Sequence, residues 1–244
     1  MKLGLTVKHL INRFGYDVRY YRPLFDLTVA PFAIKTILDI GANDGHFAKV
    51  MSEQFPNAHI FAFEPLSDCF NHLSEVAKLY KNITPIQSGL GTQHGSMEIE
   101  RSDFHPSSSL LPMSALHKKL YPKSAVSTKE TISITRLDDI AKTIDIALPL
   151  MVKIDVQGYE GKVIEGGKET LSKASFIQIE TSFFSLYEGQ PLFTDIAEQL
   201  HALGFSYYGA LQTHYSKKTG RPMYEDSLFI HTLVRSQFES QELS

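Results

Sequence analysis

The sequence predicts an α/β protein with a doubly wound, mostly parallel sheet that ends in an antiparallel hairpin. Three observations lead to this prediction. Short, nearly continuous apolar runs alternate with amphipathic helical stretches along residues 36–181, as expected for strands buried on both faces of a parallel sheet. A glycine-rich turn follows the first run, where a strand passes into a helix. The last two apolar runs have no helix between them, so we expect them to pair antiparallel.

The composition fits a folded protein of this class. The chain has 244 residues, 43% hydrophobic and 21% charged, with a formal net charge of −3, which excludes global disorder. A charge near zero offers little attraction for a polyanion, so we expect no nucleic-acid partner. The single cysteine, Cys69, excludes an intramolecular disulfide framework.

The apolar runs also argue against a membrane or secreted protein. They are far shorter than the roughly 18 residues that span a bilayer. Lys8 and His9 interrupt the apolar core that a signal peptide would need. We therefore expect a cytoplasmic protein with no membrane span.

The patterning divides the chain into three parts. Apolar residues at helical spacing near the start predict a helical extension over residues 1–35. We predict one folded domain over residues 36–234. The polar residues 235–244 are expected to form a frayed tail.

The first half of the domain alternates strands and helices. We predict strand, helix, strand, helix and strand over residues 36–40, 46–55, 59–63, 69–80 and 82–87. Pro85 cannot donate a hydrogen bond to a neighbouring strand, so the third strand should lie at an edge of the sheet.

The second half continues the pattern and ends differently. We predict strand, helix, strand, helix and two paired strands over residues 149–156, 160–171, 175–181, 192–203, 205–210 and 226–231, with the last helix ended by Gly204. Five parallel strands and a final hairpin form the Rossmann-like plan of the class I methyltransferase fold, whose members use S-adenosylmethionine. A dehydrogenase would more often continue with βαβ units.

Residues 102–130 interrupt the alternation. They lie between two alternating stretches, SMEIERS and TISITR, which we expect to form a projecting β pair. Loops longer than about 15 residues are usually functional or disordered. This one has too many apolar residues for a free linker, so we interpret it as a lid over the active site, with a surface excursion as the alternative.

The first candidate site is DIGANDG, residues 39–45, between the first strand and its helix. Its glycines let a ligand approach the backbone, and the helix start offers free amide donors. Glu64, at the end of the second strand, can bind both hydroxyls of a ribose. The motif lacks the middle glycine of a dinucleotide site, so a ligand with an amino-acid carboxylate, such as S-adenosylmethionine, fits better than NAD. A turn without a ligand is the alternative.

The second candidate site is KIDVQGYE, residues 153–160, at the end of the fourth strand. In an open α/β sheet this end faces the ligand crevice. A buried lysine and aspartate are unfavourable unless they are paired or used in function. The structural alternative is an ion pair of Lys153 with Asp155 or Glu160.

The chain resembles the FkbM-type methyltransferases from about Thr36 to His231. The motifs that carry the resemblance are DIGANDG, FEP (63–65), SSL (108–110), TRLDD (135–139), KIDVQGYE and EDSLFI (225–230). Two departures are the run SGLG (88–91), where alanine-leucine-glycine is more frequent, and Arg136 in place of a common leucine. The resemblance implies a class I methyltransferase domain that transfers methyl from S-adenosylmethionine, usually to a hydroxyl of a sugar or secondary metabolite.

The resemblance also implies which residues bind the cofactor: Asp39, Gly41, Asn43, Gly45, Glu64, Pro65, Leu66, Gly89 and Asp155. The glycine-rich turn would surround the methionine part, and Glu64 would hold the ribose. Pro65, Leu66 and Gly89 would border the adenine. Asp155 would face either the methionine amine or the acceptor hydroxyl.

Transfer to oxygen requires a base that removes the hydroxyl proton. The candidates are Asp155, Glu180, His214 and Asp226, and we predict Asp155 and Glu180 as the catalytic residues. Glu180 could instead cap a helix or pair with Lys153. His214 could be a solvated side chain in a polar loop, and Asp226 a charge at the start of a strand. No tight ligand spacing supports a metal, so we predict none.

Two other functions remain open. A nicotinamide-dependent oxidoreductase is disfavoured by the missing glycine and by the absence of a Tyr-x-x-x-Lys pair. A non-catalytic protein that keeps the fold is disfavoured by the intact Gly41, Glu64 and Asp155. The expected partner is a small-molecule or glycan acceptor, which the sequence does not identify.

Overall fold

The computed structural model describes Phe25, residues 28–102, 109–114, His117, 127–216 and 218–235. Most of the predicted helical extension, most of the candidate lid and nearly all of the polar tail lie outside these residues, so these three assignments stay predictions. Within the described ranges, no helix has the length and apolar character needed to cross a membrane.

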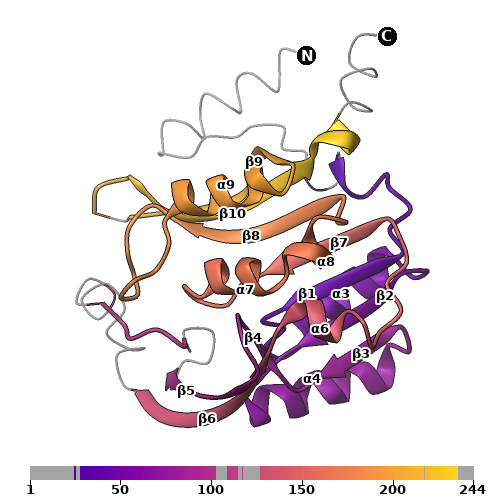
Figure 1. Ribbon diagram of the computed structural model, residues 1–244, viewed down its shortest axis with the longest axis horizontal. Helices are drawn as coiled ribbons and strands as arrows, with labels where there is room; N and C mark the ends of the chain where they lie inside the picture. The colour runs from indigo at the N-terminus through magenta and orange to yellow at the C-terminus, as the bar shows by residue number, and fades with distance from the viewer. Residues whose placement is uncertain are drawn as a thin grey trace, which may run out of the picture.

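A seven-stranded sheet forms the centre of the protein, in the order β3-β2-β1-β7-β8-β10-β9 (Figure 1). The neighbours from β3 to β8 pair parallel, and β10 pairs antiparallel with β8 and β9. The predicted parallel sheet with a final hairpin is confirmed, and the strand with Pro85 lies at an edge. The strands are β1 (Thr36–Ile40), β2 (His59–Phe63), β3 (Ile83–Ile86), β7 (Leu150–Ile154), β8 (Phe176–Ser182), β9 (Phe205–Tyr215) and β10 (Pro222–His231).

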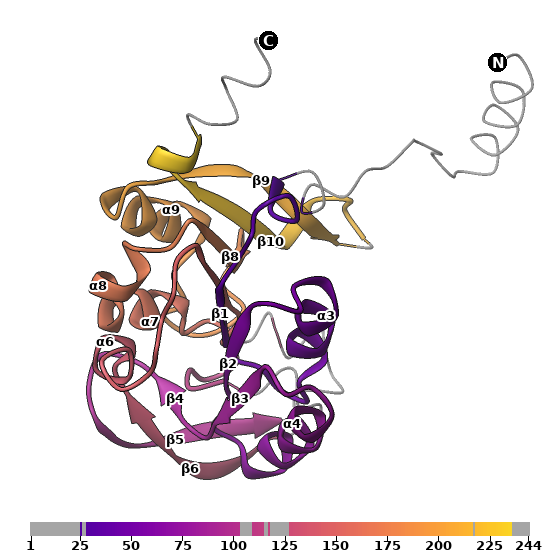
Figure 2. The same ribbon diagram turned by 90° about the vertical axis from the view of Figure 1, so that its right-hand side faces the viewer.

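Helices cover both faces of this sheet, which gives a three-layer architecture (Figure 2). One face carries α3 (His46–Gln54) and α4 (Ser67–Leu79). The other face carries α6 (Leu137–Ile140), α7 (Glu160–Gly166), α8 (Lys168–Leu171) and α9 (Phe193–Ala202). The prediction of one continuous helix over residues 160–171 is wrong. Two adjacent glycines, Gly166 and Gly167, interrupt it because glycine has a low helix propensity.

Gly166 allows the backbone of α7 to pack closely against the backbone of Gly91. A Cβ atom on Gly166 would lie 1.8 Å from the carbonyl oxygen of Gly91. We expect Gly166→Ala to lower the free energy of unfolding by about 1–3 kcal/mol, because the added methyl group forces these segments apart. Gly161→Ala, in the same helix, meets only Pro191 and the flexible side chain of Gln199, at 3.3 Å each.

Gly161→Ala is therefore the matched control for this packing prediction. Its change in stability should stay within about 1 kcal/mol, since alanine also favours the helix. Denaturant unfolding of both variants measures the difference. Equal losses of stability in the two variants would contradict the assignment of Gly166 to close backbone packing.

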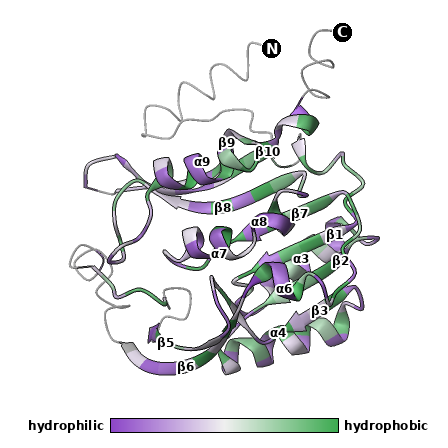
Figure 3. Cartoon of the chain, in the orientation of Figure 1, coloured by the Kyte–Doolittle hydropathy of each residue, from purple (hydrophilic) through white to green (hydrophobic). Residues whose placement is uncertain are grey.

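The core has one apolar layer on each face of the sheet. All residues of β1 and β7 are buried, as their apolar sequences predict. Successive side chains of β1 point to opposite faces, so Ile37 joins the cluster with α3 and α4, whereas Leu38 joins the cluster with α7 and α9. The colouring by hydropathy shows mainly hydrophobic residues along β1 and β2 (Figure 3).

A second, three-stranded sheet lies beside the main one. It contains β4 (Gly89–Leu90), β5 (Gly95–Ser102) and β6 (Ser127–Thr135), in the order β4-β6-β5. The predicted β pair is confirmed by the antiparallel ladder of β5 and β6. Ile99 and Ile132 from this pair are buried against Leu66 and Cys69 near the start of α4. The small sheet thus covers the region that follows β2.

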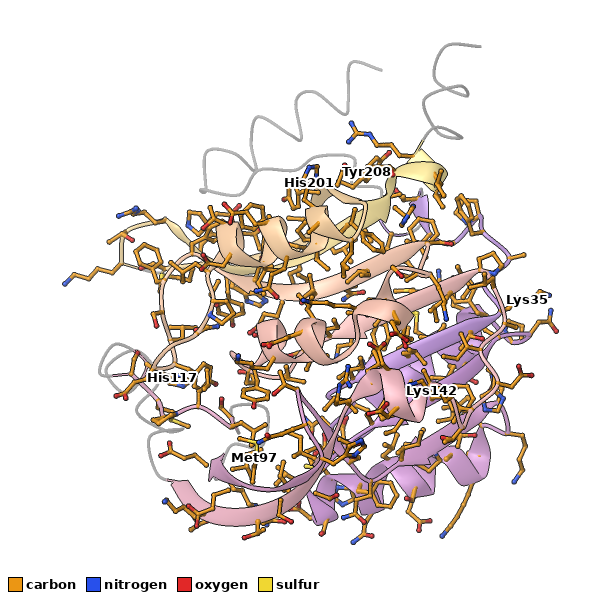
Figure 4. The ribbon with its side chains drawn as sticks, viewed as in Figure 1. Lys35, Met97, His117, Lys142, His201 and Tyr208 are labelled. Carbon is orange, nitrogen blue, oxygen red and sulfur yellow. The ribbon has the colours of Figure 1, made fainter. Side chains whose placement is uncertain are left out.

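The direction of the parallel strands fixes the edge at which a ligand can bind. Lys35, directly before β1, lies at one side of the molecule, and Met97 of β5 and His117 lie at the opposite side (Figure 4). The carboxyl ends of the parallel strands face this second side (Figure 1). In open α/β sheets, ligands bind at the carboxyl ends of the strands.

Candidate functional site

The turn between β1 and α3 forms the floor of the site. Gly41 and Gly45 adopt left-handed conformations, with φ of 81° and 85°, and Asn43 does so with φ of 50°, which asparagine tolerates better than most residues. A Cβ atom on Gly41 would lie only 1.9 Å from the carbonyl oxygen of Asp155. Only glycine therefore fits where the end of β1 meets the segment after β7.

Glu64, directly after β2, closes this turn with its carboxylate. One oxygen accepts a hydrogen bond from the backbone N–H of Asn43 and the other from that of Leu66, each at 2.9 Å. A carboxylate offers about four acceptor positions, so positions remain for two hydroxyl donors of a ligand. Glu64 is only 5% exposed. Desolvation raises its pKa to about 7, although the two backbone donors act in the opposite direction.

A cavity lies above the turn, and most of the predicted ligand-binding residues line it. Asp39 and Gly45 are not among the lining residues: Asp39 is fully buried within β1, and Gly45 packs against Leu73 of α4. Of the predicted residues, those that line the cavity are Gly41, Asn43, Glu64, Pro65, Leu66, Gly89 and Asp155.

Sequence reasoning missed the apolar wall of this cavity. Ile99 and Ile132 come from the small sheet, Leu110 from the segment between β5 and β6, and Tyr159 from the start of α7. The alternation in SMEIERS and TISITR indicates that the β pair has one apolar face. Nothing in that local pattern says that the apolar face covers the carboxyl end of β2.

Lys153 connects the floor of the cavity to the interior of the sheet. Its side chain is 11% exposed, and Nζ lies 3.4 Å from Asp39 Oδ1 and 3.5 Å from Asp155 Oδ2. It also donates a hydrogen bond to the carbonyl oxygen of Gly41, at 3.1 Å. Desolvation opposes the charge on Lys153, yet the charges of Asp39 and Asp155 hold its pKa above the ordinary value. Lys153 is thus a buried cation shared by two carboxylates.

The predicted alternative pair of Lys153 with Glu160 does not form among the described residues. Glu160 instead accepts hydrogen bonds from the backbone N–H groups of Val156 and Gly158, each at 3.1 Å. The partner that sequence reasoning missed is Asp39, which lies opposite Lys153 in the register of β1 and β7. The side chain of Glu160 closes the turn before its own helix, which directs it away from Lys153.

Three carboxylates meet beside Lys153. Asp155 follows β7, and Glu180 of β8 lies directly opposite Asp226 of β10 in the antiparallel ladder. Desolvation, followed by the charge of Asp155, raises the pKa of Glu180 and of Asp226. Ionising all three groups at once is therefore unfavourable, and the cluster is suited to hold a proton.

His214 does not lie in a polar loop, contrary to the prediction. It belongs to β9, and its ring stacks on Tyr224 with the centroids 4.4 Å apart. The hairpin strands extend beyond their apolar runs because β9 is an edge strand with many half-exposed positions. In the part of the chain that the structure describes, no three His, Cys, Asp or Glu side chains are grouped so as to hold a metal ion.

Burial of Glu160 leads to a testable dependence of stability on pH. Glu160 is 2% exposed, and desolvation raises its pKa from 4.5 to about 7. Between these values the native state binds a proton that the unfolded state has lost, so stability falls as the pH rises from 4.5 to 7. Glu160→Gln keeps an acceptor for both backbone N–H groups, which bind the same oxygen.

Glu160→Gln changes the free energy of unfolding, and we expect this change to be more stabilising at pH 8 than at pH 5, by about 1–3 kcal/mol. Denaturant unfolding at the two pH values gives this difference. Glu198→Gln, at an exposed position of α9, is the control and should have the same small effect at both. A difference for Glu160→Gln that does not depend on pH would contradict the prediction.

The sequence is similar to a methyltransferase family and to individual methyltransferases. The family described as Methyltransferase FkbM domain matches residues 39–207. The chain is 30% identical over 191 residues to the 2-O-methyltransferase NoeI of Sinorhizobium fredii, covering 71% of this chain and 73% of that protein. It is 28% identical over 145 residues to the hexuronic acid methyltransferase AglP of Haloferax volcanii, covering 58% of this chain and 54% of that protein.

Among solved structures, the chain is similar to Aeropyrum pernix fibrillarin in complex with S-adenosyl-L-methionine. The TM-score is 0.48 at 10% sequence identity, covering 93% of this chain and 74% of that one.

Proposed function

The chain belongs to the FkbM methyltransferase family, and on this premise we propose that it transfers the methyl group of S-adenosylmethionine to a hydroxyl oxygen of a sugar. Two relatives support this acceptor, since one is named a 2-O-methyltransferase and the other a hexuronic acid methyltransferase. The observation on the site that carries the proposal is Asp155. It lines the cavity and its side chain is 33% exposed, whereas Lys153 behind it is buried.

The cavity fits S-adenosylmethionine. Glu64 is buried at its floor, and its carboxylate retains acceptor positions for the two ribose hydroxyls. The apolar wall of Leu66, Ile99 and Ile132 suits the flat face of an adenine. Gly41 and Asn43, which line the cavity beside the glycine-rich turn, would face the methionine part.

When bound, S-adenosylmethionine supplies an electrophilic methyl group on a sulfonium sulfur. The protein must then align the acceptor oxygen with that methyl group, which can lower a barrier by about 7–11 kcal/mol. It must also accept the hydroxyl proton as the new bond to oxygen forms. We assign this proton to the carboxylate of Asp155, which is within reach of the cavity. Glu180, which is half-buried and does not line the cavity, is the second carboxylate of the cluster.

A methyl-transfer screen with radiolabelled S-adenosylmethionine and a panel of hexose and hexuronic acid glycosides tests the proposal. We expect label on a hydroxyl oxygen of at least one glycoside. Calorimetry should detect binding of S-adenosylhomocysteine and none of NAD. Binding of NAD in preference to S-adenosylhomocysteine would favour an oxidoreductase, and label transferred only to non-sugar acceptors would overturn the sugar as substrate.

A further inference from the structure

Gln157 connects both carboxylates that we consider as bases. Its side-chain Nε2 donates a hydrogen bond to Asp155 Oδ1 at 2.8 Å and lies 3.4 Å from Glu180 Oε1. The other end of the amide, Oε1, accepts a hydrogen bond from the hydroxyl of Tyr187 at 2.9 Å. An amide nitrogen carries two hydrogens, so one N–H can serve each carboxylate.

The orientation of this amide follows from the chemistry of its neighbours. As the base, Asp155 carries an ionised carboxylate that only accepts hydrogen bonds, so the –NH₂ end of the amide must face it. The oxygen end then faces Tyr187, whose hydroxyl must donate. Tyr187 is 1% exposed, and its ring packs on Gly158, where a Cβ atom would lie 3.0 Å from it. Tyr187 is therefore fixed in place and fixes the direction of the amide.

The backbone of Gln157 is held in an uncommon conformation. Its φ is 53°, and among the described residues only Gln157 and Asn43 combine a positive φ with a side chain. Left-handed glutamine is unfavourable and persists where surrounding contacts enforce it, often at functional sites. Here Ser109 supplies such a contact, because its hydroxyl donates to the carbonyl oxygen of Gln157 at 2.5 Å.

Asp155 is consequently held from two sides. Oδ2 lies near Lys153 Nζ and Oδ1 accepts from Gln157, so the carboxylate has little freedom to rotate. We propose that Gln157 is a positioning residue, directed by Tyr187, that orients the carboxylate of Asp155 toward the acceptor hydroxyl. This inference rests on the proposed function of Asp155 as the base.

The test uses Gln157→Asn in the full chain. Asparagine adopts the left-handed backbone more readily than glutamine, but its amide is one methylene too short to reach Asp155. We expect kcat to fall by about 10–100-fold for the glycoside that the wild type methylates fastest, because a small misplacement of a reacting group has effects of this size. The KM for that glycoside and the affinity for S-adenosylhomocysteine should stay within about threefold.

Tyr187→Phe tests whether the hydroxyl of Tyr187 directs the amide of Gln157. It should lower kcat by about 3–10-fold, and adding it to Gln157→Asn should cause no further loss, since Tyr187 acts through that amide. Tyr207→Phe is the matched control. It also removes a hydroxyl that donates to a side chain, here Glu225 at 2.9 Å. Neither Tyr207 nor Glu225 lines the cavity, so Tyr207→Phe should leave kcat unchanged.

A crystal structure of Gln157→Asn gives a readout that needs no acceptor. We expect Asp155 in more than one orientation there and in a single orientation in the wild type. If no glycoside is methylated, the proposed acceptor fails while this structure still decides the role of Gln157. Full kcat in Gln157→Asn, a loss of S-adenosylhomocysteine affinity equal to the loss in kcat, or an unmoved Asp155 carboxylate would each overturn the inference.

Discussion

Asp155→Asn is expected to lower turnover by about 10²–10⁴-fold, the range that loss of a general base produces. The substitution keeps the size of the side chain and removes its basicity. Asp155 is the carboxylate that both lines the cavity and remains partly exposed beside the buried Lys153. Affinity for S-adenosylhomocysteine should be nearly unchanged. Single-turnover rates and calorimetry on the same variant measure the two quantities.

Asp39→Asn is the matched control for the ion pair. Asp39 and Asp155 lie at almost the same distance from Lys153 Nζ, 3.4 and 3.5 Å, but Asp39 is fully buried and does not line the cavity. We therefore expect Asp39→Asn to reduce stability while most turnover is kept. If both variants lose turnover equally, the ion pair and not the base explains the result for Asp155.

Two other outcomes for Asp155→Asn would assign Asp155 a role other than the base. An affinity loss for S-adenosylhomocysteine comparable to the rate loss would indicate that Asp155 binds the methionine amine. Full activity with full affinity would leave only the pairing with Lys153, and the base would then be assigned to Glu180.

Glu64→Ala is expected to weaken S-adenosylhomocysteine binding by about tenfold to a hundredfold, because removing a charged hydrogen-bond partner costs about 1.5–3 kcal/mol. The buried carboxylate is the polar group of the cavity floor best placed for ribose hydroxyls. Calorimetry measures the affinity, and circular dichroism checks that the fold is intact.

Glu64→Gln distinguishes the loss of the negative charge from the loss of the whole side chain. Glutamine keeps the length of the side chain but has one acceptor end, whereas Glu64 accepts from backbone N–H groups at both oxygens. We expect an intermediate loss of affinity. Unchanged affinity in Glu64→Ala, with the fold intact, would be incompatible with a ribose contact.

Features set by short stretches of sequence were predicted well. The apolar runs gave the bounds of β1 and β2, since strands buried on both faces contain few polar residues. Pro85 located the edge strand because the lack of an N–H is a local property. The glycine turn and Glu64 were located by the strands that they follow, and both reach the cavity.

Features set by contacts between distant segments were not predictable in this way. Asp39 lies beside Lys153 only because β1 pairs with β7 in one particular register. The apolar wall exists because the β5–β6 pair folds over the end of β2. The orientation of Gln157 depends on Tyr187, which follows β8 in the chain.

The sequence by itself thus determined the order of strands and helices, the crevice at the carboxyl ends of the strands and the residue types that enter it. Hydrophobic period and backbone preference carry this information over a few residues at a time. Only the tertiary structure decided which carboxylate shares Lys153, which carboxylates Gln157 joins, and what closes the cavity. These depend on strand register and on the packing of segments far apart in the chain, which no local pattern encodes.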